Sequence, residues 1–469
     1  MKSVPSSGLN VLKSYSLIVF KSYSLIVFLF LCAATLSAQP DPYQARRDKL
    51  IEKTDKGLIV LVNNGGQDYV STKGENQNFY YLTGASTANA IFVIDGKSGK
   101  STIYRSVSRW GEPEAAPAGL EVKASEDLAK DLPKLVSANP TIWIEMNQLK
   151  LLDQAGFGLS RLETIKNITP QINDMRPVKD DTEISLIRKA AEINALGLVE
   201  MMKAAEPGMN EKDLDLILDY TFKKLGSTGY SFGTQAASGP NSTSVHYGAN
   251  NRTTQPGDMM VFDIGAEYMS YTADISRTIP ISGKFTKEQK EIYSVVLNAQ
   301  KAAIAKMQPG KSINEAYETV TNELNKGLFA LGLLTDTTQA WQKSFWMQHG
   351  WGHHIGLVVH DVSGPYVPGK SDLLIPGMIY TMEPGLYFPA DYLEKGDRRA
   401  RNVSETDWKV FLEKVEPIFK KYINIGVRIE DDVLITPTGN EVITSAVPKE
   451  IAEIEAVMKM KSRFNQSAH

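Results

Sequence analysis

The stretch "MMVFDIGAEYMSYTADISRT", residues 259–278, contains two short apolar runs that meet at a turn, and each run carries a carboxylate. If the turn centres on Tyr268 and Met269, antiparallel pairing places Asp263 directly opposite Asp274, with both side chains on one face. Two adjacent like charges in an apolar strand pair are destabilising unless a cation lies between them. The pattern therefore predicts a hairpin with a cation-binding face.

Two further acids lie inside apolar strands. Glu383 falls in "MIYTMEPGLY" and Glu430 falls in "GVRIEDDVLIT". An ion pair of Asp263 or Asp274 with Arg252 or Arg277 is the alternative for the first hairpin, and it leaves the other two acids unexplained. A divalent metal site explains all four acids together, and two metals explain their number better than one.

Strand alternation sorts the residues around Glu430 into two faces. Arg428 and Glu430 are expected on one face, and Ile429 and Asp431 on the other. Arg428 is therefore expected on the same side as the predicted metal site.

The first 38 residues resemble a secretory signal peptide. Lysines are followed by the apolar run "LIVFLFLCAA" and by small residues, with cleavage expected after Ala38. The alternative is an uncleaved membrane anchor, but Lys21 leaves an apolar run too short to span roughly 30 Å of hydrocarbon. We therefore expect an exported protein, periplasmic or secreted, with no stable membrane anchor after cleavage.

Composition limits the possible partners and metal ligands. The 469 residues are 42% hydrophobic and 22% charged, with a net charge of −3, which does not favour a nucleic-acid partner. The single cysteine, Cys32, lies in the predicted signal peptide. The mature chain would contain no cysteine, so disulfides and thiolate metal sites are excluded and only His, Asp and Glu remain as metal ligands.

Residues 39–172 read as a small α/β domain. Its expected strands lie in "GLIVLVNNGG" (57–66) and "PTIWIEMN" (140–147), and "NAIFVIDGKSGKSTIYR" (89–105) reads as a hairpin that turns near Asp95-Gly96. These runs are separated by helical patches, which favours mixed layers rather than an all-β domain.

Residues 173–469 read as an α+β domain. Long helices are expected over 181–205 and 210–226, followed by strands from about 255 with a helical interlude over 286–331. The charged segment between Glu383 and Glu430, residues 390–422, is expected to be an exposed insertion that is partly helical.

The order of these motifs resembles a known family. Asp263, Asp274, "HGWGHHIGLVVHD", "TMEPGLY" and "GVRIEDD" resemble the pita-bread-fold metallopeptidases, and most closely the aminopeptidase P group, the Xaa-Pro aminopeptidases. "NFYYLTG" (78–84) is similar to the N-terminal domain of that group. The resemblance implies a pita-bread catalytic domain preceded by a smaller α/β domain. It also implies a metalloaminopeptidase that acts on peptides with proline in second position, and possible homo-oligomers.

The resemblance also implies the metal ligands. Asp263 would bind one divalent ion, His353 and Glu383 the other, and Asp274 and Glu430 would bridge both. An oxygen-rich set with one imidazole favours Mn(II) over Zn(II).

Catalytic roles are implied for six side chains. Glu383 would accept the proton of the attacking water, and His360 would stabilise the tetrahedral oxyanion. His246 and His349 would line the proline side, while Arg428 and Tyr387 would orient Glu430 and relay protons. His354 falls on a variable position of the motif and is expected to have no catalytic role.

Three alternatives share parts of this pattern. Prolidase, which cleaves only dipeptides, has the same implied ligands. A metal-free pita-bread binding module and a creatinase-type hydrolase are disfavoured, because all five implied ligands are present.

Overall fold

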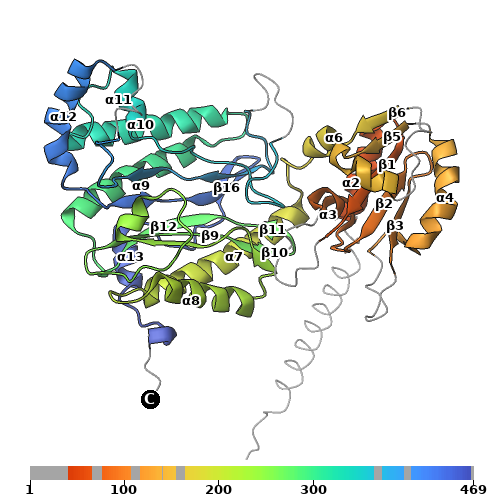
Figure 1. The fold of residues 1–469 in the computed structure, drawn as a ribbon, viewed down its shortest axis with the longest axis horizontal. Coiled ribbons are helices and arrows are strands. Elements are labelled where there is room, and N and C mark those ends of the chain that lie inside the picture. Colours follow the sequence, from red (N-terminus) through yellow and green to blue (C-terminus); the bar gives the residue numbers. More distant parts are fainter. Residues whose placement is uncertain are drawn as a thin grey trace, which may run out of the picture.

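A computed structural model describes residues 41–65, 76–106, 117–139, 141–154, 164–363, 372–395 and 403–465. The predicted signal peptide, residues 1–38, lies outside the described residues. Two bodies lie next to each other, a smaller one that ends near residue 173 and a larger one that begins at the helix α7 (Figure 1). Within the described ranges, no helix has the length and apolarity needed to cross a membrane.

The smaller body is built on a six-stranded mixed sheet in the order β4-β3-β2-β1-β5-β6. β1 is buried along its whole length, pairs antiparallel with β2 and parallel with β5, and confirms the strand expected over 57–66. β2 and β3 confirm the predicted hairpin. The strands are β1 (Leu58–Asn63), β2 (Ala90–Asp95), β3 (Lys100–Arg105), β4 (Glu121–Ala124), β5 (Thr141–Ile144) and β6 (Thr164–Asn167). The helices are α2 (Pro42–Lys53), α3 (Gln77–Thr83), α4 (Ser125–Ala138), α5 (Leu149–Gln154) and α6 (Thr169–Asn173).

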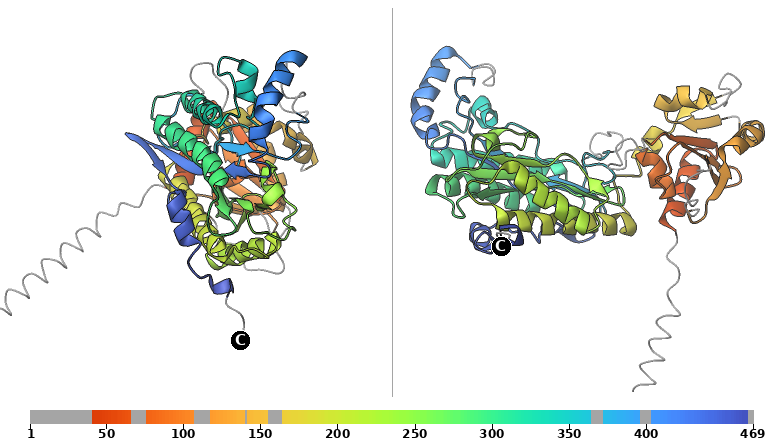
Figure 2. Two further views of the ribbon diagram at one scale, coloured as in Figure 1. Left: turned by 90° about the vertical axis from the view of Figure 1, so that its left-hand side faces the viewer. Right: turned by 60° about the horizontal axis from the view of Figure 1, so that its bottom comes forward.

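Two long helices open the larger body, as predicted. In α7 (Asp181–Ala204), Asp180 and Glu183 form a capping box that satisfies free amide groups at the helix start. In α8 (Glu211–Lys224), Asn210 caps the start, and Gly226 follows the end with a φ of +87°. These helices lie along one side of the larger body (Figure 2).

Small antiparallel sheets and two further helices complete the larger body. α9 and α10 pack against each other, and their buried residues join one large apolar core with those of α7, α8 and the strands. The sheet orders are β12-β9-β8, β11-β10-β7 and β13-β16-β17, with β14 paired to β15. The strands are β7 (Gly229–Tyr230), β8 (Gln235–Ser238), β9 (Met259–Ile264), β10 (Ala266–Tyr268), β11 (Tyr271–Thr272), β12 (Ile275–Pro280), β13 (Ile379–Met382), β14 (Gly385–Tyr387), β15 (Gly426–Arg428), β16 (Asp431–Thr436) and β17 (Gly439–Val442). The helices are α9 (Lys287–Lys306), α10 (Ile313–Leu331), α11 (Ala340–Phe345), α12 (Glu405–Phe419) and α13 (Ile451–Val457).

The predicted register of the first hairpin is wrong by two positions. The turn consists of Met269 and Ser270, with φ values of +47° and +64°, so Asp263 lies opposite Ser276 rather than Asp274. Two consecutive left-handed residues give the tight turn whose twist matches the flanking strands. A shift of two positions keeps the same side chains on the same face, so Asp263 and Asp274 still share a face as diagonal neighbours.

The insertion between Glu383 and Glu430 contains α12, which confirms that the segment is partly helical. The prediction that it is exposed is wrong for one face of this helix. Phe411, Val415 and Phe419, spaced by four residues, are buried, and Phe411 contacts rings of α11. Residues 396–402 of the insertion lie outside the described residues.

Candidate metal centre

The five side chains expected to bind metal come from separate elements and line one cavity of about 700 Å³. Asp263 lies in β9, and Asp274 directly precedes β12. Glu383 follows β13, Glu430 lies between β15 and β16, and His353 belongs to the loop before β13. Residues more than 160 positions apart are therefore brought to one site by the pairing of short strands.

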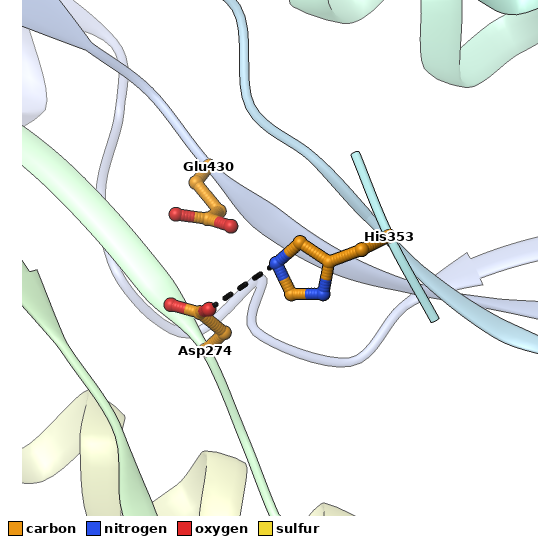
Figure 3. A group of neighbouring side chains, drawn as sticks. All are labelled: Asp274, His353 and Glu430. Atoms are coloured by element: carbon orange, nitrogen blue, oxygen red, sulfur yellow. Dashed lines mark ion pairs between the residues drawn. The ribbon is translucent and has the colours of Figure 1, made fainter. Parts of the chain in front are cut away.

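Asp274, His353 and Glu430 form the tightest group. One ligand atom from each lies within 4.8 Å of the others, and the three side chains converge from different segments (Figure 3). The Nε2 atom of His353 is 3.6 Å from Asp274 Oδ2 and 3.7 Å from Glu383 Oε1. Three of the five predicted ligands thus meet directly, and Glu383 lies beside them.

The ring of His353 is held in an orientation suited to metal binding. Its Nδ1 atom lies 3.0 Å from the carbonyl oxygen of His354, so Nδ1–H donates there and Nε2 keeps its lone pair toward the carboxylates. Burial lowers the pKa of His353 to about 4, which keeps the ring neutral at neutral pH.

The carboxylates of this group fit a divalent cation. Asp274 Oδ1 and Glu430 Oε1 are buried and have no hydrogen-bond partner among the described residues. Burial raises the pKa values of Asp274 and Glu430 well above normal, and neighbouring carboxylates raise them further. Buried acids that face other acids are costly when ionised, and a bound cation removes that cost.

Asp263 has protein partners on both oxygens. Oδ2 accepts from Arg428 at 2.6 Å and from Gln235, and Oδ1 lies 3.1 Å from the Ser276 hydroxyl, whose one proton it shares with Glu430 Oε2. The alternative in which Asp263 or Asp274 pairs with Arg252 or Arg277 is not observed, because Arg252 pairs with Asp258 and Arg277 pairs with Asp431.

Arg428 connects several of the predicted residues. It contacts Asp263 directly and reaches Glu430 through Ser276, whose hydroxyl lies 2.9 Å from Arg428 Nε and 2.8 Å from Glu430 Oε2. Arg428 and Glu430 therefore share a face, as strand alternation predicts. Arg428 also donates to the Tyr387 hydroxyl at 3.0 Å. Burial raises the pKa of Tyr387 to about 12, so the phenol keeps its proton.

Glu383 lies at the edge of the group beside His349. Its Oε2 atom is 3.7 Å from His349 Nδ1, and His349 Nε2 is 2.9 Å from the Tyr387 hydroxyl. Burial and, to a smaller extent, the nearby Asp263 carboxylate raise the pKa of Glu383 against the effect of Arg428, and the net result is a pKa of about 7 in the metal-free site. A carboxyl group with such a pKa can both accept and return a proton near neutral pH.

The remaining histidines differ in their positions relative to the cavity. His246 and His360 line the cavity, and the His360 ring centroid lies 4.1 Å from that of His353. His354 is buried against Tyr380, outside the set of side chains that line the cavity.

Two contacts at this site are absent from the sequence-based prediction. Ser276 follows Asp274 by two positions, so strand alternation could have placed its hydroxyl on the same face. Gln235 comes from β8, a separate segment, and no pattern in the sequence points to its contact with Asp263.

Comparison with known families agrees with this geometry. The family model described as "Metallopeptidase family M24" matches residues 185–437, and the model for "Aminopeptidase P, N-terminal domain" matches residues 43–109. The chain belongs to metallopeptidase family M24. Within that family it falls in the aminopeptidase P group, which confirms the resemblance, the pita-bread fold and the metalloaminopeptidase class.

Individual relatives cover nearly the whole chain. An Xaa-Pro aminopeptidase of Escherichia coli is 31% identical over 454 residues, which cover 89% of this chain and 97% of the relative. A human Xaa-Pro dipeptidase is 30% identical and covers 89% of this chain and 93% of its own length. The solved structure of E. coli aminopeptidase P with the inhibitor Pro-Leu aligns with a TM-score of 0.75 at 30% identity, over 89% of this chain and 97% of that one.

Proposed function

We propose that the protein is an exopeptidase that releases the N-terminal residue from peptides with proline in second position. The observation that carries this proposal is the group of Asp274, His353 and Glu430. Two carboxylates meet one neutral imidazole there, and each carboxylate has a buried oxygen without a hydrogen-bond partner among the described residues. The Xaa-Pro aminopeptidase relatives and the aminopeptidase P structures support the substrate class.

We further propose that the site holds two Mn(II) ions. Asp263 and the pair His353 and Glu383 would each serve one ion, and Asp274 and Glu430 would bridge them. The predominance of carboxylate oxygen over nitrogen supports Mn(II). Bound ions would supply Lewis acidity and would lower the pKa of water at the site.

The protein's own groups would orient the substrate and move protons. Glu383 would take the proton of the attacking water and return it to the leaving nitrogen. His360 would stabilise the oxyanion, and His246 and His349 would contact the proline side. Tyr387, between His349 and Arg428, would hold a proton in reach of the site.

A peptide panel tests this proposal. Mn(II)-loaded protein is expected to cleave Xaa-Pro-Yaa tripeptides at the first bond and to leave N-acetylated tripeptides intact, because the free amine must bind near the metals. Turnover of Xaa-Pro dipeptides with no turnover of tripeptides would instead assign the activity of the dipeptidase relatives. Cleavage of neither class would contradict the proposal.

We also propose export by cleavage of residues 1–38, a domain boundary between residues 172 and 173, and a homo-oligomer. The composition of the N-terminus supports export, and the change of architecture over residues 174–180, directly after α6, supports a boundary close to the proposed position. N-terminal sequencing of the exported protein should begin at Gln39. Light scattering should give a mass of at least two chains.

A further inference from the structure

The loop that carries His353 and His360 is followed directly by Asp361, a carboxylate that the proposed chemistry does not use. Its side chain is 2% exposed. Asp361 is not part of the cavity wall, so it cannot act on a substrate there. Asp361 can therefore act only through the groups that it contacts.

Two buried cations hold the Asp361 carboxylate. The guanidinium of Arg176 pairs with Oδ1, and Lys179 Nζ lies 3.3 Å from Oδ2. Both cations come from the segment between α6 and α7, and their side chains are 5% and 0% exposed. Burial raises the pKa of Asp361, but Arg176 and Lys179 lower it by more, so the group stays ionised.

The backbone of Asp361 reaches the His353 ring through one carbonyl oxygen. The amide of Asp361 donates to the carbonyl of His354 at 2.9 Å. The same oxygen lies 3.0 Å from His353 Nδ1. The contact that sets the orientation of the metal-facing ring is therefore fixed at its other end by Asp361.

Gly356 makes room for this arrangement. A Cβ atom at Gly356 would lie 2.0 Å from Asp361 Oδ2, so any side chain would displace the carboxylate. The Gly356 carbonyl accepts from the amide of Thr272 at 2.8 Å, two residues before Asp274. The loop is thus braced between the carboxylate of Asp361 and the strand that leads to a second predicted ligand.

Arg176 extends the contact into the smaller body. Its Nη1 atom donates to Asn78 Oδ1 at 2.9 Å. The Asn78 amide in turn donates to Glu145 at 2.6 Å. A continuous set of buried polar contacts therefore runs from the sheet of the smaller body to the loop that carries His353.

We propose that Asp361 is a positioning residue that sets the geometry of His353 and His360, and that Arg176 makes this geometry depend on the smaller body. The activity measured in its test rests on the proposed peptidase function, whereas the metal affinity does not.

The test compares Asp361→Asn with a matched control, Asp258→Asn. Asp258 is also a mostly buried carboxylate, paired with Arg252 at 2.5 Å. Isothermal titration calorimetry with MnCl₂ on chelator-treated protein gives the Mn(II) affinity, and tripeptide hydrolysis gives kcat and KM. We expect Asp361→Asn to lose about 10- to 100-fold in Mn(II) affinity or in kcat. KM should change by less than about threefold, because Asp361 does not line the cavity, and the control should retain both values.

A second pair of variants separates positioning from folding. Arg176→Lys keeps a cation beside Asp361 and should retain more Mn(II) affinity and kcat than Arg176→Met. If Asp361→Asn does not fold, this pair decides the proposal. The proposal is overturned if Asp361→Asn keeps the wild-type Mn(II) affinity and kcat and shows only a lower Tm. If Asp361→Asn does not fold, the same result for Arg176→Met overturns it. If the wild type cleaves no Xaa-Pro peptide, the peptidase function fails, and the Mn(II) affinities still decide the role of Asp361.

Discussion

Glu430 and Asp431 are adjacent in the chain and both are buried, yet their carboxylates have opposite surroundings. Asp431 accepts from Arg277 at 2.7 Å, from Lys449 at 2.6 Å and from Thr444 at 2.8 Å. Burial raises the pKa of Asp431, but the two cations lower it by more, to about 2. Asp431 therefore has its counter-ions within the protein.

Glu430 faces the other side of the same strand segment. Its Oε2 atom accepts from Ser276, and its Oε1 atom has no partner among the described residues. Burial raises its pKa well above normal, and Glu383 and Asp263 raise it further. A buried acid among cations is part of the scaffold, whereas a buried acid among acids needs a cation from outside.

The largest loss of activity is expected from Glu430→Gln. The change removes a bridging ligand, so kcat/KM should fall by roughly 10³-fold, the equivalent of the several kcal/mol that bound metal supplies. In the metal-free state the variant should unfold at the same or a higher temperature, because Gln replaces an acid that burial and neighbouring carboxylates make costly to ionise. Tripeptide kinetics and thermal unfolding in EDTA measure both effects, with the exposed Glu441→Gln as control. Full turnover of the tripeptide by Glu430→Gln would show that Glu430 does not have the proposed metal-binding role.

Asp431→Asn should have the opposite effect, a large loss of stability with a smaller loss of activity. It leaves Arg277 buried without its carboxylate, and breaking a buried ion pair costs about 3–5 kcal/mol of unfolding free energy. Urea unfolding of the metal-free protein measures this loss. The folded fraction should keep more activity than Glu430→Gln. An Asp431→Asn protein as stable as the wild type would show that the scaffold role is wrong.

The pH dependence of the metal-free protein should reveal the acids on the metal side. Burial raises the pKa of Glu383 to about 7, and those of Asp274 and Glu430 are raised as well. The folded state then holds protons that the unfolded chain, with a glutamate pKa near 4.5, has already released. Most of the Glu383 contribution to the unfolding free energy is lost between about pH 4.5 and 7. Its remainder, together with the contributions of Asp274 and Glu430, should make the unfolding free energy fall further from about pH 7 to 8.5, by an amount on the order of 1 kcal/mol.

Asp432 and Glu183, whose pKa values burial also raises, add to the same decline, whereas Asp431 and His353 contribute little in that window. Asp431, with a pKa of about 2, is ionised in both states, and His353, with a pKa of about 4, is neutral when folded and nearly so when unfolded. Urea melts in EDTA across the window measure the slope. Saturating Mn(II) should reduce the decline, and Glu383→Gln should reduce it by a smaller amount. An unfolding free energy that rises with pH in EDTA would contradict the assignment.

The smallest effect is expected from His354→Gln, which extends the comparison to two adjacent histidines. His353 faces the carboxylates, whereas His354 packs on Tyr380 with a ring separation of 3.9 Å. Since its backbone carbonyl is retained, kcat/KM should stay within about threefold of the wild type. A loss of tripeptide turnover as large as that of His353→Gln would place His354 in the catalytic site.

The sequence alone identifies most of the site, because burial of an acid can be read from its apolar neighbours. Asp263, Asp274, Glu383 and Glu430 each lie within or at the end of an apolar run, and alternation correctly separates Glu430 from Asp431. Family resemblance, rather than any periodicity, singled out His353 among four histidines in twelve residues.

What could not be predicted depends on contacts between distant segments. The hairpin register depended on two residues in the left-handed conformation, Met269 and Ser270, and neither residue type favours that conformation. The contact of Gln235 with Asp263 and the ion pair of Arg176 with Asp361 join separate segments, so no local pattern encodes them. The buried face of α12 was not predicted, because charged residues lie between the apolar residues Phe411, Val415 and Phe419, which are four positions apart.

The central claim is that the carboxylates on the Glu430 side of the strand bind divalent metal. An anomalous-difference map from crystals soaked in Mn(II) tests it directly. We predict two peaks per chain among Asp263, Asp274, Glu383, Glu430 and His353, and none beside Asp431. A map without a peak in that cavity, or with its strongest peak elsewhere, would contradict the account.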